Sequence, residues 1–484
     1  MAQSIKVNYF FNLVNTLAGI LFPLITFPYA SRIMEADGIG QVSFFTSIIN
    51  YISLFTSLGI PIYAIREIAK VRDDQVQMNK TALEILFLHA ALTIIGYIVV
   101  AILCVTVAKI SLNIPLFLIL SLSIFFTAIG CEWFYKGIED FKYITIRGLI
   151  VRIVYVILLF TLVHSKSDLF IYAALSVLGT VGNNIFNFVR LRKYFKPHIL
   201  FLKDLCISRH IIPAIRIFAL NAVISLYVNL DTIMLGFLRD NAAVGYYEGA
   251  TKMTKLLLGI VQALQTAMIP RFSYLAKAET MAKFDELCQK VVDFIVMISI
   301  PIAAVLFVLA PVFITLFCGS TYTPAIITLR IISPIVILIS LSGIPCFQIL
   351  YPLGKENIAI MSTATGAFVN LLLCVICIPL LSENGAAIAT VVGEATVAVT
   401  MYLYGWKYIH IKYKSTHYLN CVIGGILMFG TMFYLSKFGL GDFLNLVLIP
   451  LSGFLIYGSF LYFRKDSFVV YILMIVTNKI KSSF

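Results

Sequence analysis

Residues 211–270 read IIPAIRIFALNAVISLYVNLDTIMLGFLRDNAAVGYYEGATKMTKLLLGIVQALQTAMIP, and the interpretation of the whole chain starts from them. They predict two apolar helices of membrane length, joined by a short turn at Arg239, Asp240 and Asn241. A charged side chain at the centre of a membrane helix costs about 2.5 to 3.5 kcal/mol. The charges within this hairpin therefore predict a function for their side chains, which are Arg216, Asp231, Glu248, Lys252 and Lys255.

Three of these charges share one face of the second predicted helix. Glu248, Lys252 and Lys255 follow the spacing i, i+4 and i+7, so they can line a polar cavity between helices. Two other interpretations stay open. Glu248 and Lys252 can simply pair with each other, or the lysines can extend their ammonium groups toward the lipid headgroups. The second is harder for Lys255, which lies further from the turn.

The composition indicates a membrane protein. Hydrophobic residues make up 61% of the 484 and charged residues only 12%, which no soluble globular class shows. The net charge of +13 comes from Lys and Arg residues that lie between apolar runs, so it indicates membrane orientation and gives no reason to expect a nucleic-acid partner. The first apolar run, residues 7–33, is too long for a cleavable signal and is expected to remain as the first span.

Apolar runs of about 20 residues predict an all-α polytopic membrane protein with fourteen spans. If the N-terminus is cytoplasmic, 26 of the 36 Lys and Arg residues fall in cytoplasmic segments and five in the outer turns. This asymmetry predicts that both termini are cytoplasmic. The predicted spans are 7–31, 41–65, 82–108, 113–134, 144–163, 168–189, 211–236, 243–269, 289–317, 323–350, 358–381, 385–405, 417–436 and 443–463.

The chain also repeats itself at an offset of 205 residues. This shift superimposes Asp37-Gly38-Ile39-Gly40 on Ala242-Ala243-Val244-Gly245, each in a turn between two predicted helices, and Arg66 on Arg271. The repeat predicts two six-helix lobes that are related by a pseudo-twofold axis along the membrane normal. The predicted domains are an N-terminal lobe at 1–196, a C-terminal lobe at 197–412 that begins with a basic cytoplasmic linker, and helices 13 and 14 with a cytoplasmic tail at 413–484.

The repeat pairs charges in the second lobe with neutral polar residues in the first. One cavity with a charged wall and a hydrogen-bonding wall would explain both sets. In the other interpretation, the hydroxyls bond their own helix backbone or allow close packing of helices. The pairs are Asp231 with Thr26, Glu248 with Ser43, Lys252 with Ser47, and Lys255 with Asn50.

Nothing in the sequence predicts covalent chemistry, so no catalytic residue is expected. The six His residues are scattered without metal-ligand spacing, and no GxxxxGK[ST] phosphate loop occurs. Cys374 and Cys377 form a CxxC inside an apolar run, where core packing is the simpler interpretation. We therefore expect no metal and no cofactor. Transport energy would come from an H⁺ or Na⁺ gradient, from consumption of the product, or from a partner.

Four segments together resemble one family. PLITFPYASRIMEADGIGQVSFFTSI (23–48) and SLGIPIYAIREIAKVRDD (57–74) are similar to the N-terminal signature of bacterial polysaccharide repeat-unit flippases of the O-antigen and capsule type. NLDTIMLGFLRDNAAVGYYEGATKM (229–253) and PLGKENIAIMSTATGAFVNLLLCVICIPLLSENGAAIAT (352–390) resemble the second lobe of that family. The family belongs to the multidrug and oligosaccharidyl-lipid exporter superfamily. The resemblance implies a MATE-like fold, a central cavity and alternating access.

The resemblance further implies a substrate, which is an oligosaccharide on polyprenyl pyrophosphate. It would be flipped from the cytoplasmic to the periplasmic leaflet of a bacterial inner membrane, with a glycan polymerase and chain-length machinery as candidate partners. The pyrophosphate needs cations, and arginine is its better bidentate partner. Arg66 and Arg271 are candidates to gather the headgroup, although ordinary positive-inside residues would look the same. The candidates to line the passage are Arg152, Arg216, Arg330, Lys252 and Lys255.

The sequence leaves open whether transport is coupled to an ion, and it leaves two alternative functions open. Asp231, Glu248 and Glu394 are the acids available to take up an H⁺ or Na⁺ ion, unless they only pair with nearby basic residues. A multidrug or cation antiporter of the same fold is an alternative, for which a more acidic cavity would be expected. A membrane glycan polymerase is a second alternative, against which the short outer turns and the lobe repeat argue.

Overall fold

The computed structural model describes residues 5–194, 205–277, 281–409, 415–438, 441–466 and 468–470. These residues form helices and contain no strand, which confirms the predicted all-α class. Among them, eleven helices are long and apolar enough to cross a membrane, or twelve if the bent pair Lys166–Val181 and Asn183–Leu191 is one span. The number fourteen stays a prediction, because Leu21–Val71 is one continuous segment that covers parts of two predicted spans.

The chain divides into two compact units, Met1–Gly245 and Tyr246–Phe484, here called unit 1 and unit 2. The predicted lobe boundaries, after residues 196 and 412, lie outside the described residues. Unit 1 contains α1 (Ile5–Ser57), α2 (Ile60–Val71), α3 (Gln75–Thr106), α4 (Ala108–Ser111), α5 (Ile114–Gly130), α6 (Glu132–Gly137), α7 (Phe141–Leu162), η1 (Lys166–Asp168), α8 (Leu169–Val181), α9 (Asn183–Leu191), α10 (Ser208–Leu238) and the start of α11 (Asn241–Lys277).

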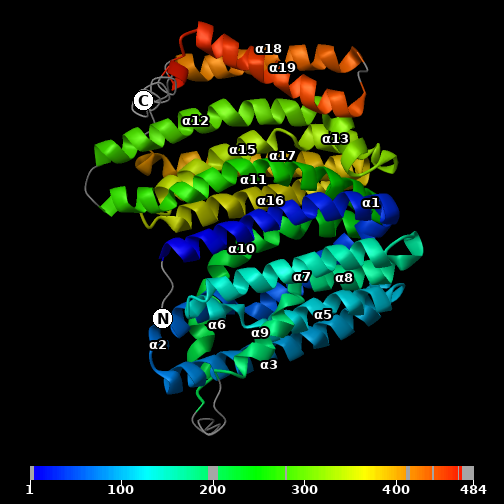
Figure 1. The fold of residues 1–484 in the computed structure, drawn as a ribbon, viewed down its shortest axis with the longest axis vertical. Helices are drawn as coiled ribbons and strands as arrows, with labels where there is room; N and C mark the ends of the chain where they lie inside the picture. The colour runs from blue at the N-terminus through cyan, green and yellow to red at the C-terminus, as the bar shows by residue number, and fades with distance from the viewer. Residues whose placement is uncertain are drawn as a thin grey trace. The chain divides into compact units, whose positions relative to one another are not determined.

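Unit 2 holds the rest of α11 and the helices that follow it (Figure 1). In this unit α18 and α19, which correspond to the last two predicted spans, pack against each other and against α12. The helices are α12 (Met281–Val308), α13 (Ala310–Phe317), η4 (Ser320–Tyr322), α14 (Ala325–Ile332), α15 (Ile335–Gly343), the π-helix η5 (Ile344–Leu350), α16 (Glu356–Leu381), α17 (Glu383–Gly405), η6 (Trp406–Tyr408), α18 (Ser415–Leu435), η7 (Ser436–Phe438) and α19 (Asp442–Phe463).

Local sequence signals explain where several helices begin and end. Asp240 accepts a hydrogen bond from the backbone N–H of Ala243 (2.9 Å), so it caps α11 at the turn that the sequence predicts. The two turns predicted at residues 37–40 and 242–245 both lie earlier in the chain: α1 breaks at Glu35, which has a φ of 53°, α11 begins at Asn241, and both four-residue segments are helical. Gly59 adopts a φ of 71° between α1 and α2, a conformation that glycine tolerates without strain.

Each unit buries apolar side chains inside and exposes others outside. In unit 1, Ile60, Ile68 and Phe134 are completely buried in one cluster that joins α2 and α6. On α3, by contrast, Ile94 is 64% exposed and Ile98 is 55% exposed. A soluble protein rarely exposes such continuous apolar surface, whereas a lipid bilayer accepts it. The exposed apolar faces therefore agree with a protein that crosses the membrane several times.

Candidate functional site

The predicted charged face of α11 exists in unit 2. Lys252 is half-buried and interacts electrostatically with Glu248 and Lys255, while the Lys255 side chain is exposed. The helical spacing therefore brings the three charges together, as predicted. Tyr247, next to Glu248, bonds the hydroxyl of Thr390 on α17 (2.8 Å). Glu394 lies one turn further along α17 and is half-buried.

The predicted polar wall of unit 1 is only partly buried. Thr26 is buried and donates to the backbone carbonyl of Phe22 (3.0 Å), which is the bond that the alternative interpretation expects. Ser47 is buried, Ser43 is half-buried and Asn50 is exposed. A single cavity between these residues and the α11 charges would join the two units, and it stays a prediction.

The charges contributed by α10 differ in their surroundings. Asp231 is 6% exposed and interacts electrostatically with Tyr51 of α1. The Arg216 side chain is exposed. Asp231 is therefore enclosed within unit 1, whereas Arg216 is accessible from outside it.

The remaining predicted cations lie in different surroundings. Arg66 is exposed, pairs with Glu67 (3.2 Å) and lies over the Tyr63 ring, and Arg271 is exposed over the Tyr274 ring. Both are therefore accessible to an anion at the surface of their own unit. Two others are half-buried: Arg152, and Arg330, whose Nε donates to the carbonyl of Phe307 (3.4 Å).

Sequence reasoning missed a buried ionic network in unit 1. Glu84 of α3 has no exposed surface, yet its Oε2 accepts from Arg209 (2.5 Å) and from Nε2 of His210 (2.8 Å). Nδ1 of His210 then accepts from the Tyr63 hydroxyl (2.7 Å), and Oε1 of Glu84 accepts from the backbone N–H of Cys206 (2.8 Å). The network therefore ties the start of α10 to α2 and α3. The only sequence signal was an acid inside an apolar run.

A second missed network centres on Arg147, which lies near the start of the predicted span 144–163. Its side chain is 5% exposed, and it donates to the amide oxygen of Asn187 and to Glu132 (3.3 Å). The Arg147 guanidinium also lies over the Tyr143 ring. Arginine stacks on aromatic faces and pairs with carboxylates at once, which explains its burial here. The sequence separations of Arg147 from Glu132 and Asn187 follow no local pattern, so the sequence did not predict this network.

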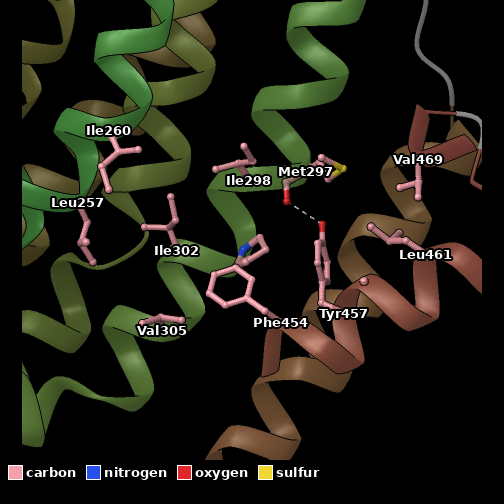
Figure 2. Close-up of a pocket in the computed structure, with 12 residues that line it drawn as sticks. Leu257, Ile260, Met297, Ile298, Ile302, Val305, Phe454, Tyr457, Leu461 and Val469 are labelled. Carbon is pink, nitrogen blue, oxygen red and sulfur yellow. Dashed lines mark hydrogen bonds between the residues drawn. The ribbon is translucent and has the colours of Figure 1, made fainter. Parts of the chain in front are cut away.

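Unit 2 contains an apolar groove with a volume of about 510 Å³ between α11, α12 and α19. Figure 2 shows side chains of all three helices around it, including Leu257, Ile302 and Phe454. The hydroxyl of Tyr457 is satisfied by the carbonyl of Met297 (2.9 Å), so it offers no free donor. The volume falls within the roughly 300–1,000 Å³ of typical ligand pockets. Such a groove can hold an apolar chain.

Metal-binding geometry is not found in the described part of the chain. No group of three or more His, Cys, Asp or Glu side chains there could hold a metal ion. The nine cysteines, all of which lie in the described part of the chain, form no disulfide.

A family match, two relatives and a solved structure each relate this chain to proteins of polysaccharide biosynthesis or lipid-linked transport. The model of the family described as "Polysaccharide biosynthesis protein" matches residues 5–276. The "Putative O-antigen transporter" of Escherichia coli (strain K12) is 24% identical and covers 83% of this chain and 96% of its own, and that of Shigella dysenteriae is 28% identical, covering 73% and 88%. Among solved structures, the inward closed conformation of the lipid II flippase MurJ aligns with a TM-score of 0.69 at 15% identity, over 95% of this chain and 99% of its own.

Proposed function

This chain belongs to the polysaccharide biosynthesis protein family, and we propose that it is a flippase that moves oligosaccharide repeat units on polyprenyl pyrophosphate from the cytoplasmic to the periplasmic leaflet. Relatives that align with most of the chain carry the name of O-antigen transporters. Its fold is that of a protein named as a flippase of lipid II. Its function is transport rather than catalysis, as the names of its relatives indicate. Alternating access of two lobes is the mechanism that we propose.

The apolar groove of unit 2 is the observation that carries this proposal. A lipid-linked glycan has a long apolar tail that must remain in hydrocarbon while its polar headgroup crosses. The groove lies between helices that are long and apolar enough to cross the membrane, so it can keep such a tail beside the transporter throughout. An antiporter for small hydrophilic cations has no use for an apolar groove, so the groove argues against that half of the antiporter alternative. A multidrug exporter would use such a groove for lipophilic drugs, and the experiment below separates it from the flippase.

The headgroup in this proposal is held by cations. Pyrophosphate carries several negative charges. The half-buried ammonium group of Lys252 attracts these charges more strongly than an ammonium group in bulk water would. Lys252 and Lys255 then bind the pyrophosphate during passage, and Arg66 and Arg271 attract it before entry. Asp231, Glu248 and Glu394 stay candidates for ion coupling. The proposed location is the bacterial inner membrane with both termini in the cytoplasm, and a glycan polymerase and chain-length machinery are the proposed partners.

The decisive experiment uses a strain that lacks this gene. Its polyprenyl-linked glycans are extracted, and the membrane face they occupy is determined with a membrane-impermeant glycan-modifying reagent. We expect complete single repeat units on the cytoplasmic face, and their disappearance when the wild-type gene is restored. Single units on the periplasmic face would instead indicate a polymerase. Normal glycan together with new sensitivity to cationic dyes would indicate a drug exporter.

A further inference from the structure

A buried histidine joins three parts of unit 2. His417 lies in the first turn of α18, and its side chain is 1% exposed. Its Nδ1 lies 2.8 Å from Oδ1 of Asp466, which follows α19, and its Nε2 lies 3.1 Å from the backbone carbonyl of Asp293 on α12. Both of these oxygens are acceptors, so both ring nitrogens must donate. His417 and Asp466 therefore form a buried ion pair, here called the His417–Asp466 pair.

Asp466 is held by further hydrogen bonds. Its Oδ2 accepts from the side-chain amide of Asn420 (3.2 Å), and its Oδ1 also accepts from the backbone N–H of Phe468 (3.1 Å). The backbone N–H of Asp466 donates to the carbonyl of Leu461 (3.0 Å). The preceding residue, Lys465, has a left-handed φ of 50°, a conformation that persists in a non-glycine residue only where the surroundings hold it. The chain that leaves α19 is therefore anchored at Asp466.

The anchored chain reaches the apolar groove of unit 2. The α19 residues that line the groove share one helical face, and they are Phe454, Tyr457, Gly458 and Leu461. α19 ends at Phe463, and Val469 continues the row of lining side chains past this end. Figure 2 shows Val469 beside Leu461 and away from Phe454. The groove therefore extends beyond α19 through a residue that lies three positions after Asp466.

The contacts of Phe468 connect Val469 to the His417–Asp466 pair. The Phe468 ring is 7% exposed and lies against the His417 ring, with 5.8 Å between the ring centroids. The backbone N–H of Val470 donates to the carbonyl of Asp466 (3.0 Å). Val469 lies between these two fixed neighbours and is half-buried in the groove wall. Its position therefore depends on the contacts of the pair.

We propose that His417 is a positioning residue that holds Val469 in the groove wall and so lets the groove bind long apolar chains better than short ones. The inference rests on the proposed function, in which the groove holds a polyprenyl tail. The stretch from Phe454 to Leu461 spans about 10 Å by helical rise, so a short chain can lie entirely beside α19. A long chain continues past Leu461 and gains contact with Val469.

The chemistry of the pair favours this positioning role. A buried ion pair adds little stability compared with apolar residues of the same volume, because both charges lose their hydration. It does restrict its partners to one arrangement, since each donor needs its acceptor. The His417–Asp466 pair is therefore better suited to fixing the place of the chain after α19 than to stabilising the fold.

Binding is tested on the purified full-length protein in lipid nanodiscs, by competition against a photoreactive polyprenyl phosphate. The competitors are a long polyprenyl phosphate and geranyl phosphate, which share a headgroup and differ in chain length. His417→Ala should weaken binding of the long chain about tenfold, which corresponds to the loss of roughly two buried methylene groups. Binding of geranyl phosphate should be unchanged. Equal weakening of both competitors, or of neither, would overturn the proposal.

Two further variants assign the effect to the pair. Asp466→Asn removes the other charge at nearly constant volume and should reproduce the loss that is specific to the long chain. Tyr418→Phe is the matched control, because the Tyr418 hydroxyl donates to the Asp293 carboxylate (3.3 Å) and accepts from Gln289 (3.1 Å) in the same cluster. It should bind both competitors as the wild type does. A loss in Tyr418→Phe as large as that in His417→Ala would contradict the assignment.

The position of Val469 is measured directly by maleimide labelling. Val469→Cys is made in a Cys206→Ser background, since Cys206 is an exposed native thiol. Labelling should be several-fold faster when His417→Ala is added, whereas Phe463→Cys, at a residue that is 80% exposed, should label equally in both backgrounds. An unchanged rate at Val469→Cys would overturn the positioning role.

The binding assay also separates this inference from the proposed function. Wild-type protein that binds neither competitor would remove the groove from the proposed function, and this inference with it. Wild-type protein that binds the long chain, together with a His417→Ala variant that binds it equally well, would overturn only the role of His417.

Discussion

Gly40 and Gly245 occupy equivalent positions in a reciprocal backbone contact within unit 1. A Cβ added to Gly40 would lie 1.7 Å from the carbonyl oxygen of Asn241, and one added to Gly245 would lie 1.9 Å from that of Ala36. The 205-residue offset relates Gly40 to Gly245 and Ala36 to Asn241. The two contacts are therefore copies of each other, as expected around a local twofold axis.

Alanine at either glycine should disrupt this contact. The clashing atoms belong to the backbone and cannot rotate away, so Gly40→Ala should destabilise the protein by about 1 to 3 kcal/mol, as overpacking does. The measurement is the thermal unfolding midpoint of purified protein. Gly259→Ala on α11 is the control, since an added Cβ there meets nothing within 4 Å and alanine favours a helix. A Gly40→Ala midpoint at or above that of the control would contradict the contact.

The buried Glu84 network should matter for stability. Glu84→Ala leaves His210 and the Cys206 N–H without their acceptor, and we expect a loss of about 2 kcal/mol, the range for hydrogen bonds to charged groups. Glu67→Ala is the control, because Glu67 pairs with two exposed cations and surface pairs contribute about 0 to 1 kcal/mol. Thermal unfolding of both variants is compared with the wild type. If the two variants lost the same stability, the burial of Glu84 would not increase its contribution to the stability of the protein.

The α11 lysines should be needed for transport but not for folding. Replacing Lys252 and Lys255 together with Gln removes the proposed pyrophosphate ligands, so export of the glycan should be abolished while the amount of folded protein in the membrane is unchanged. Export is measured as surface polysaccharide in the deletion strain carrying the variant gene. Lys290→Gln is the control, since Lys290 pairs with the exposed Glu286 (2.6 Å). Full export by the double variant would remove both lysines from the mechanism.

Filling the apolar groove should also impair export. Gly458 lines the groove on α19, and a Cβ there would meet nothing within 4 Å, so Gly458→Phe can occupy the groove without a backbone clash. We expect at least a tenfold drop in glycan export at normal protein levels. Gly430→Phe on α18 is the control, because that glycine is equally unobstructed but is not among the residues that line the groove. Unchanged export by Gly458→Phe would separate the groove from the transport path.

Parts of the candidate site could be predicted from the chain and parts could not. The spacing of Glu248, Lys252 and Lys255 was sufficient to bring them together, because helix geometry alone relates residues three and four apart. His210 is separated by 126 residues from Glu84, and no local pattern links them. The predicted cations also differ in ways that spacing does not reveal: Arg66 pairs at the surface, whereas Arg330 lies half-buried against Phe307.

The sequence by itself determined the membrane class, the helical fold and the turn at Asp240, because apolar length, basic asymmetry and capping residues act over one helix or less. Only the tertiary structure decided which polar groups meet. The reciprocal contact of Gly40 and Gly245 and the burial of Glu84 both depend on how distant helices pack. Packing brings together residues that are far apart in the chain, and hydropathy along a single helix carries no information about its neighbours.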